Sequence, residues 1–200
     1  SEVNKMRDFH VFIEQQGEQI YVGKITGSGS EDAVFSYAQE YLDNPSSCPI
    51  SIHLPLQAQN FSAEETSLFF EGLLPEGFTR KCVAGWIHAD EYDYLTILAA
   101  LGRECLGAIQ IIEDGMDVPK AGYQKLTKED VCRLAKEGAS EAAELVTKAH
   151  LSLTGASGKV GLYYKIDTNE WYLPIGAAPR THIVKQSHVR LDGIVTNEQL

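Results

Sequence analysis

The stretch at residues 152–185 reads SLTGASGKVGLYYKIDTNEWYLPIGAAPRTHIVK, and it determines the fold that we expect for the second half of the chain. It opens with a loop of small and hydroxylated residues and then alternates apolar runs with turn residues. Strands are predicted at 160–166, 171–174 and 181–185, because these runs are rich in β-branched and aromatic residues and are bounded by Asp, Asn, Gly or Pro. We expect them to form one antiparallel sheet.

The loop that opens this stretch has the composition of a phosphate-binding loop. Small side chains leave backbone N–H groups free to approach phosphate oxygens, and hydroxyl and ammonium groups add donors. The candidate ATP- or phosphate-binding residues are Ser152, Thr154, Gly155, Ala156, Ser157, Gly158 and Lys159. The loop lacks the GxxxxGK[ST] pattern, because Leu153 and Val160 stand where glycine and a hydroxyl residue are needed, and it lacks GxGxxG spacing. By itself it is also compatible with a plain connection.

A lysine ends the last predicted strand of the stretch. Lys185 follows two apolar residues and lies 26 positions after Lys159. In a kinase small lobe, a lysine at the end of such a strand holds the nucleotide phosphates beneath a glycine-rich loop. The ammonium group suits this role because it is a compact charge with three donors. We predict that Lys185 contacts phosphate; an exposed lysine at a strand end is the alternative.

The residues that would carry out phosphoryl transfer are not found in the sequence. Transfer requires a carboxylate at the attacking hydroxyl and further Asp and Asn side chains that hold magnesium. Asp167 and Asp192 are the only aspartates after the loop, and neither lies in an HxD or DFG-like segment. We predict no catalytic residue and no metal site. Thr196 to Gln199 reads as the capping box of a further helix, so we expect the chain to be truncated before a catalytic lobe.

The first 112 residues are expected to form a small mixed β-sheet with helices. Strands are predicted as a hairpin within the first 25 residues and at 34–37, 50–54 and 108–112. Three helices are predicted. The first is capped by Ser62 and Glu65, with Phe61 as a hydrophobic staple, and its apolar face is Leu68, Phe69 and Leu73. The second lies at 78–88, and the third begins behind Asp90 and ends with Gly102 at C′.

A polar segment containing Gly115 and Pro119 marks the expected domain boundary. Behind it, Thr127 is predicted to cap a helix that ends near Glu137, and a second helix is predicted at 140–149. We therefore expect an N-terminal subdomain at 1–112, a boundary loop with connecting helices at 113–150, and the beginning of a small lobe at 151–200. The predicted fold class is α+β.

Charge is distributed unevenly along the chain. The formal net charge is −11, and residues 1–112 hold 6 Lys+Arg against 16 Asp+Glu. Residues 148–190, in contrast, hold six basic residues and two acidic ones. The local excess of basic residues suits a polyanionic ligand, although an ordinary surface with a few lysines would look the same. The overall acidity argues against direct binding of nucleic acid.

The spacing of the cysteines and the hydropathy of the chain indicate in which cellular compartment the protein is expected. Cys48, Cys82, Cys105 and Cys132 show no CxxC spacing, so we expect buried free thiols rather than a metal site or a disulfide framework. No apolar stretch approaches the ~20 residues that span a bilayer. The first 15 residues contain no apolar signal core. The expected location is cytoplasmic, without a membrane partner.

Several segments resemble one known family. FFEGLLPEGFTR at 69–80 and LAALGRECLGAIQI at 98–111 resemble the N-terminal subdomain of HipA-type toxin kinases. The 152–159 and 173–185 segments resemble the glycine loop and ATP-lysine strand of the same family, and LDGIVTNEQ at 191–199 resembles the lead into its next helix. The match runs in order over nearly the whole chain, although residues 1–60 and 113–150 match only in pattern.

The resemblance implies an intact enzyme that phosphorylates serine or threonine with ATP and Mg²⁺, an aminoacyl-tRNA synthetase as typical target, and a helix-turn-helix antitoxin of HipB type as partner. It also implies that Gly155, its neighbours and Lys185 contact the phosphates. Ser152 matches a regulatory phosphorylation site, where added negative charge would compete with ATP. We expect this chain alone to be inactive. Two other hypotheses stay open: a free-standing interaction or inhibitory module, and a nucleotide-binding regulator without transfer activity.

Overall fold

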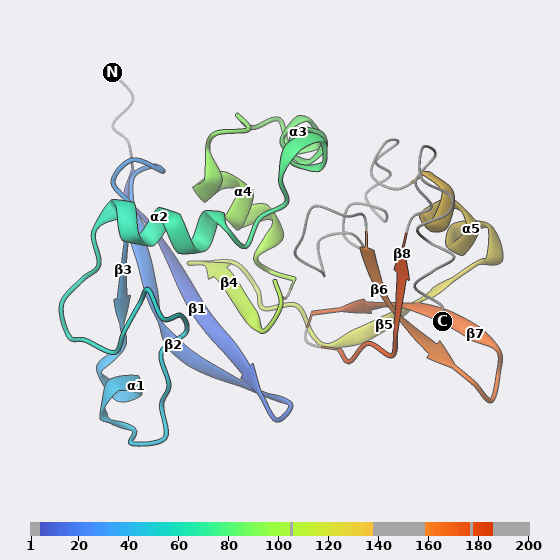
Figure 1. Cartoon of the computed structure of the whole chain (residues 1–200), viewed down its shortest axis with the longest axis horizontal. Coiled ribbons are helices and arrows are strands. Elements are labelled where there is room, and N and C mark those ends of the chain that lie inside the picture. The colour runs from blue at the N-terminus through green and yellow to red at the C-terminus, as the bar shows by residue number, and fades with distance from the viewer. Residues whose placement is uncertain (1–4, 105, 138–158, 177, 186–200) are drawn as a thin grey trace.

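Two four-stranded antiparallel sheets organise the chain (Figure 1), and a computed structural model describes residues 5–104, 106–137, 159–176 and 178–185. The first sheet has the order β3-β2-β1-β4 and the second has the order β5-β7-β6-β8. The strands are β1 (Arg7–Gln15), β2 (Glu18–Gly27), β3 (Val34–Tyr37), β4 (Ile109–Glu113), β5 (Gly122–Leu126), β6 (Lys159–Lys165), β7 (Glu170–Ile175) and β8 (His182–Lys185). The helices are α1 (Gln39–Asp43), α2 (Ala63–Glu71), α3 (Gly77–Trp86), α4 (Tyr94–Leu101) and α5 (Lys128–Glu137). The α+β prediction is confirmed, but the first sheet is wholly antiparallel rather than mixed.

The first sheet is built around the β1–β2 hairpin. Phe9 and Val11 of β1 and Val22 and Ile25 of β2 are fully buried and contribute to one core with α2, α3 and α4. The register shifts after Val11, which leaves Val22 as an extra residue in β2. Such a bulge changes which side chains face the core and increases strand twist. The hairpin was therefore predictable from alternation, whereas the bulge within it was not.

Strand β3 lies at the edge of the first sheet, and the segment around α2 satisfies its outward backbone groups. The Phe35 N–H donates to Thr66 Oγ1 at 2.9 Å, and the Phe35 carbonyl accepts from the Phe61 N–H at 2.9 Å. An edge strand without such partners is open to pairing with other chains. Thr66 is fully buried, so this hydroxyl has a structural role that the sequence pattern did not indicate.

Replacement of Thr66 tests the edge contact. Thr66→Val keeps the shape of the side chain but removes the acceptor, which leaves the buried Phe35 N–H without a partner. We expect the free energy of unfolding to fall by about 2 kcal/mol, the usual cost of an unsatisfied buried donor. Urea unfolding of Thr66→Val beside Thr66→Ser, which retains the acceptor, measures this effect. A valine variant as stable as the wild type would contradict it.

The helices of the first sheet begin largely as predicted, but the face that α2 buries differs in part from the prediction. Ser62 and Glu65 form the predicted capping box of α2, with the Ser62 N–H donating to Glu65 at 2.8 Å. The fully buried residues of α2 are Thr66 and Phe70, and of the predicted apolar face Phe69 and Leu73 pack against the core, whereas Leu68 is 68% exposed and was predicted wrongly. Phe61 stacks on Phe35 with ring centroids 5.9 Å apart. Which side chains of α2 are buried therefore depends on the contact of the helix with the edge strand β3, not on the helical period alone.

Gly102 ends α4, but not in the left-handed conformation that a C′ glycine implies. Its φ is −65°, in the ordinary helical region. A Cβ at this position would lie 2.7 Å from Ile111 Cβ, and the Gly102 carbonyl accepts from the Ile111 N–H at 2.7 Å. Glycine is therefore required because β4 approaches the end of α4 closely. The N-cap of α4 is Asp93, whose side chain accepts from the Thr96 N–H at 3.2 Å.

The segment 50–54 does not form the predicted strand. Only Ser51 and Leu54 form a bridge, with each other, and Ile52 is 90% exposed. The segment instead folds around the hydroxyl of Tyr37, which accepts from the Ile50 N–H at 3.1 Å and donates to the Leu54 carbonyl at 2.5 Å. The hydroxyl of Tyr37 thus satisfies backbone groups of the 50–54 segment that a neighbouring strand would otherwise pair.

The region 113–150 contributes more than loop and helices, because β5 within it pairs with β7 in the second sheet. Thr127 caps α5 as predicted, with the Asp130 N–H donating to Thr127 Oγ1 at 3.0 Å; the reciprocal bond from the Thr127 N–H to Asp130 Oδ2 was not predicted. The helix predicted at 140–149 and the capping box at 196–199 lie outside the described residues. Within the described residues, no helix is both long and apolar enough to cross a membrane.

The cysteines differ from expectation in their burial. Cys48, Cys82 and Cys132 are free, but Cys48 and Cys132 are exposed and Cys82 is half-buried. Cys105 lies outside the described residues. Among the residues that the structure covers, no group of three or more His, Cys, Asp or Glu side chains could hold a metal ion.

Candidate functional site

The second sheet brings the two ends of the 152–185 stretch together. Strands β6 and β8 pair antiparallel, and Lys159, the first residue of β6, is the register partner of Lys185, the last residue of β8. Directly opposed residues of an antiparallel pair have Cα atoms about 4.5 to 5.5 Å apart. The backbone therefore places Lys185 opposite the first residue of β6, which follows the candidate loop in the sequence. Figure 1 shows β6 and β8 side by side.

The remaining candidate residues cannot be placed in the same way. Residues 152–158, which hold Ser152, Thr154, Gly155, Ala156, Ser157 and Gly158, lie outside the described residues. For Lys159 and Lys185 the structure describes the backbone and not the side chains. Contacts of these residues with phosphate accordingly stay predictions, and the strand register is the observation that bears on them.

A small core fixes the β6–β8 pair. Leu162 of β6, Leu173 of β7, Leu126 of β5 and Leu134 of α5 are buried together, and Val184 of β8 packs against them. Full burial of a leucine stabilises a fold by roughly 1.5 to 3 kcal/mol. The strand that ends in Lys185 is therefore held by the same core as the strand that begins with Lys159.

A second basic side chain lies over β6. A Cβ on Gly161 would lie 2.4 Å from Arg180 Cδ, so the arginine stem packs directly on the bare backbone of this glycine. Arg180 Nε is buried and has no hydrogen-bond partner among the described residues. The sequence identified Arg180 only as one of several basic residues in 148–190. The close packing on Gly161 could not be read from spacing, because the two residues lie 19 positions apart.

Glu170 has a strongly lowered pKa, but it lies at the opposite end of β6 from the lysine pair. A hydrogen bond from Lys125, followed by those from Tyr172 and Thr168, lowers the pKa of Glu170 to about 2. Glu170 pairs with Lys165, at the opposite end of β6 from Lys159. Six residue steps of a strand span about 20 Å. Glu170 therefore fixes the β6–β7 turn and is not a candidate base at the lysine pair.

Contacts from the first sheet region reach the loop that leads into β8. The Gly176 N–H donates to Glu104 Oε2 at 2.7 Å, and Gly176 has a positive φ of 58°. A Cβ on this glycine would also lie 3.1 Å from the Pro119 carbonyl oxygen. Arg103 donates to the Asp117 carbonyl at 3.1 Å. The segment that follows α4 thus supports both the connection to β5 and the approach to β8.

A helix-covered antiparallel sheet followed by a second antiparallel sheet is the fold of the N-terminal region of HipA proteins. The chain superposes with a TM-score of 0.63 on a solved structure of the toxin–antitoxin proteins HipA and HipB of Shewanella oneidensis with their operator DNA, at 20% sequence identity. The superposition covers 86% of this chain and 39% of that chain. The HipA N-terminal domain family matches residues 15–112.

Sequence relatives agree with this fold. The chain is 32% identical over 186 residues to Y4mE, a candidate kinase of Sinorhizobium fredii, and 23% identical over 176 residues to the serine/threonine-protein kinase toxin HipA of S. oneidensis. These alignments cover 88% and 86% of this chain but only 43% and 39% of the relatives. An uncharacterized protein of Haemophilus influenzae is 30% identical over 112 residues, which cover 54% of this chain and 98% of that protein. The chain belongs to the HipA-like family and carries its N-terminal portion.

Proposed function

We propose that this chain is the N-terminal part of a HipA-like toxin kinase that phosphorylates serine or threonine on a protein target within a toxin–antitoxin system. The single observation that carries the proposal is the register of β6 and β8, which sets Lys185 opposite Lys159, where the candidate loop enters the sheet. The family resemblance points to an aminoacyl-tRNA synthetase as the target. A kinase of this type works in the cytoplasm, where ATP is available.

The residues of this chain are suited to binding a nucleotide but not to transferring its phosphoryl group. Lys185 would supply a point charge to the phosphates, and backbone N–H groups around Gly155 would donate to phosphate oxygens. ATP with Mg²⁺ supplies the phosphoryl group when bound. The sequence offers no carboxylate in an HxD or DFG-like segment, so we propose that these 200 residues bind nucleotide weakly and transfer no phosphate. Phosphorylation of Ser152 would oppose binding by repulsion.

Substitution of Lys185 tests the nucleotide site. Lys185→Ala removes a charged donor, and we expect the Kd for ATP to rise at least about tenfold, since a hydrogen bond to a charged group contributes roughly 1.5 to 3 kcal/mol. Isothermal titration calorimetry measures the change. Lys165→Ala is the matched control, because Lys165 is an exposed lysine at the other end of β6. Equal affinity of the wild type and Lys185→Ala, or equal losses in the two variants, would remove Lys185 from the site.

The structural neighbour supports a proposal for the partner. That structure contains HipB and operator DNA together with HipA. We propose that this chain binds an antitoxin of HipB type and reaches DNA only through it, because its net charge of −11 disfavours direct contact with phosphates.

A second candidate function is a free-standing interaction or inhibitory module of a split system. The H. influenzae relative favours it, because 98% of that protein aligns with 112 residues of this chain, so a protein of about that length occurs by itself. The hydrogen bond from the Gly176 N–H to Glu104 is the kind of contact through which such a module would hold the loop ahead of β8. Sequencing of the gene downstream separates the candidates: continuation into a segment with paired aspartates and an asparagine supports the kinase, and an immediate stop codon supports the module.

A further inference from the structure

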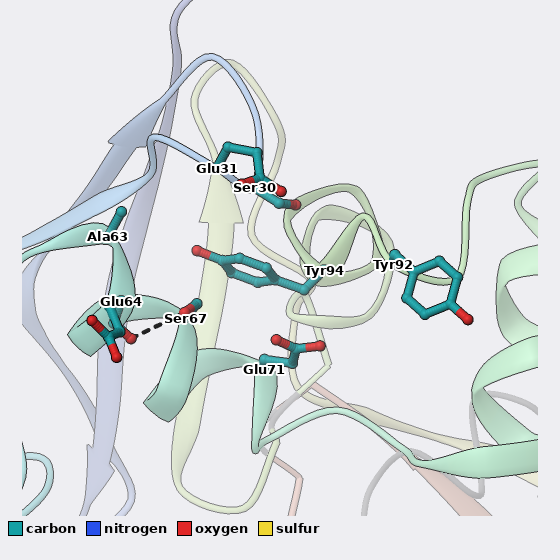
Figure 2. A pocket seen from close by; sticks show the side chains of 8 residues that line it. All are labelled: Ser30, Glu31, Ala63, Glu64, Ser67, Glu71, Tyr92 and Tyr94. Carbon is teal, nitrogen blue, oxygen red and sulfur yellow. Dashed lines mark hydrogen bonds between the residues drawn. The ribbon is translucent and has the colours of Figure 1, made fainter.

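An acidic cleft lies in the first sheet region, at a distance along the chain from the candidate nucleotide site. It has a volume of about 390 Å³ and lies between the loop that joins β2 to β3, the outer face of α2 and the start of α4. Three glutamates line it: Glu31 from the loop, and Glu64 and Glu71 from α2. Figure 2 shows the ring of Tyr94 lying between the loop and α2, with Glu71 near its base.

The hydroxyl of Tyr94 is a polar group without a protein partner. Tyr94 is only 2% exposed, and its Oη has no hydrogen-bond partner among the described residues. Burial, followed by the negative charges of Glu71, Asp32 and Asp93, raises the pKa of Tyr94 to about 12, so the hydroxyl stays protonated at neutral pH. Buried hydroxyls normally find a partner, because leaving one unpaired costs free energy. A ligand that fills the cleft would supply it.

The charge of the cleft selects a cation. Within the described part of the chain, Glu31 and Glu64 make no ion pair. Glu71 does, because its Oε1 lies 2.9 Å from Arg80 Nη2. Residues 1–112 carry a net charge of −10, which would attract a basic partner over a longer range. The two glutamates thus remain available to a positively charged group that approaches from solvent.

The spacing of the carboxylates on α2 argues against a single metal ion. Glu64 and Glu71 are seven residues apart on α2, or about 10 Å along the helix. No cluster of acidic, histidine or cysteine side chains among the described residues could hold a metal ion. A guanidinium group on its long stem carries five donors and stacks on aromatic rings.

We propose that this acidic cleft is a docking site for an arginine side chain presented by a protein partner. The guanidinium would pair with Glu31 and Glu64 and donate to Tyr94 Oη. This inference goes beyond the proposed function, since it uses none of the nucleotide-binding residues and would hold for a kinase fragment or a free-standing module alike.

The test is an NMR titration of the full chain with the peptide acetyl-Ala-Arg-Ala-amide. We expect saturable shifts of the amides of Ser30, Ser67 and Tyr94 with a Kd of about 1 mM or somewhat above, as suits a single side chain. The analogue with citrulline, which has the same shape without the charge, should give no saturable shifts. Combined Glu31→Gln and Glu64→Gln should weaken binding about tenfold, whereas combined Glu18→Gln and Glu129→Gln, two exposed positions elsewhere, should leave it unchanged.

Tyr94→Phe separates ligand binding from stability. Because the hydroxyl has no partner in the free chain, its removal should leave the Tm unchanged or slightly higher, yet weaken the arginine peptide several-fold. Unchanged affinity in this variant would overturn the assigned role of the hydroxyl and with it the site.

Other occupants are distinguishable in the same spectra. Absence of saturable shifts up to about 50 mM peptide would overturn the proposal, as would binding of the citrulline peptide with equal affinity. Equal binding of a lysine peptide would replace guanidinium recognition by simple charge attraction. Shifts at the same amides on addition of MgCl₂ alone, or on raising the protein concentration alone, would assign the cleft to an ion or to a second copy of this chain.

Discussion

Phe35→Ala should lower the free energy of unfolding of the first sheet region by about 4 kcal/mol, within the usual range for deletion of a buried aromatic ring. Phe35 is fully buried at the edge strand β3. Its ring lies 5.3 Å from that of Phe70 and 5.0 Å from that of Tyr37, both at steep angles, and it stacks on Phe61. Aromatic pairs of this geometry stabilise a core beyond the burial of their area. Truncation therefore removes the centre of a cluster and leaves a cavity beneath α2.

The two tryptophans allow this loss to be measured by region. Trp86 lies in α3, whereas Trp171 lies in β7 of the second sheet. In a Trp171→Phe background, urea unfolding followed by the fluorescence of Trp86 should show the full effect of Phe35→Ala. Phe35→Leu, which nearly conserves volume, should cost less than about 1.5 kcal/mol. An unchanged midpoint for Phe35→Ala at Trp86 would show that the aromatic cluster does not hold α2 on the sheet.

Elements that depend on near neighbours were predictable from the sequence. The capping boxes at Ser62 and Thr127 each join residues three positions apart, so the pattern contains both partners. The β1–β2 hairpin follows from alternation around a turn at Gly17. Errors arose where the partner is distant. Thr66 is buried because its hydroxyl bonds to the Phe35 N–H, 31 positions earlier, and the adjacent expectation for Leu68 failed for the same reason.

The candidate site shows the same division. The order of loop, strand and terminal lysine predicted that the strand after Lys159 and the strand that ends in Lys185 belong to one sheet, but only the fold shows that Lys159 itself pairs with Lys185. The packing of Arg180 on Gly161 and the contact between Glu104 and Gly176 join residues that no local pattern links. The unpaired hydroxyl of Tyr94 could not be predicted from the sequence either, because a tyrosine that recurs with leucines at helical spacing indicates only a core position.

Gly23→Ala is expected to be the most disruptive single-atom addition to the first sheet. Gly23 lies beside the bulged Val22 and pairs with both Val11 and Tyr37. A Cβ at this position would lie 2.1 Å from the Ser36 carbonyl oxygen and 2.9 Å from Tyr37 Cα. Both are backbone atoms of β3, so no side-chain rotation relieves the overlap. Glycine in a strand commonly marks such a close approach.

Relief of this overlap would require β3 to move away from β2, which weakens the bonds from Phe35 to Thr66 and Phe61. We expect a loss of about 3 kcal/mol, at the upper end for overpacking in a core, measured by urea unfolding with Trp86 as the reporter. Gly29→Ala is the matched control, because a Cβ there meets nothing within 4 Å. It should change stability by no more than about 0.5 kcal/mol. Equal midpoints for the two variants would mean that β2 and β3 do not approach each other as closely as the register at Gly23 requires.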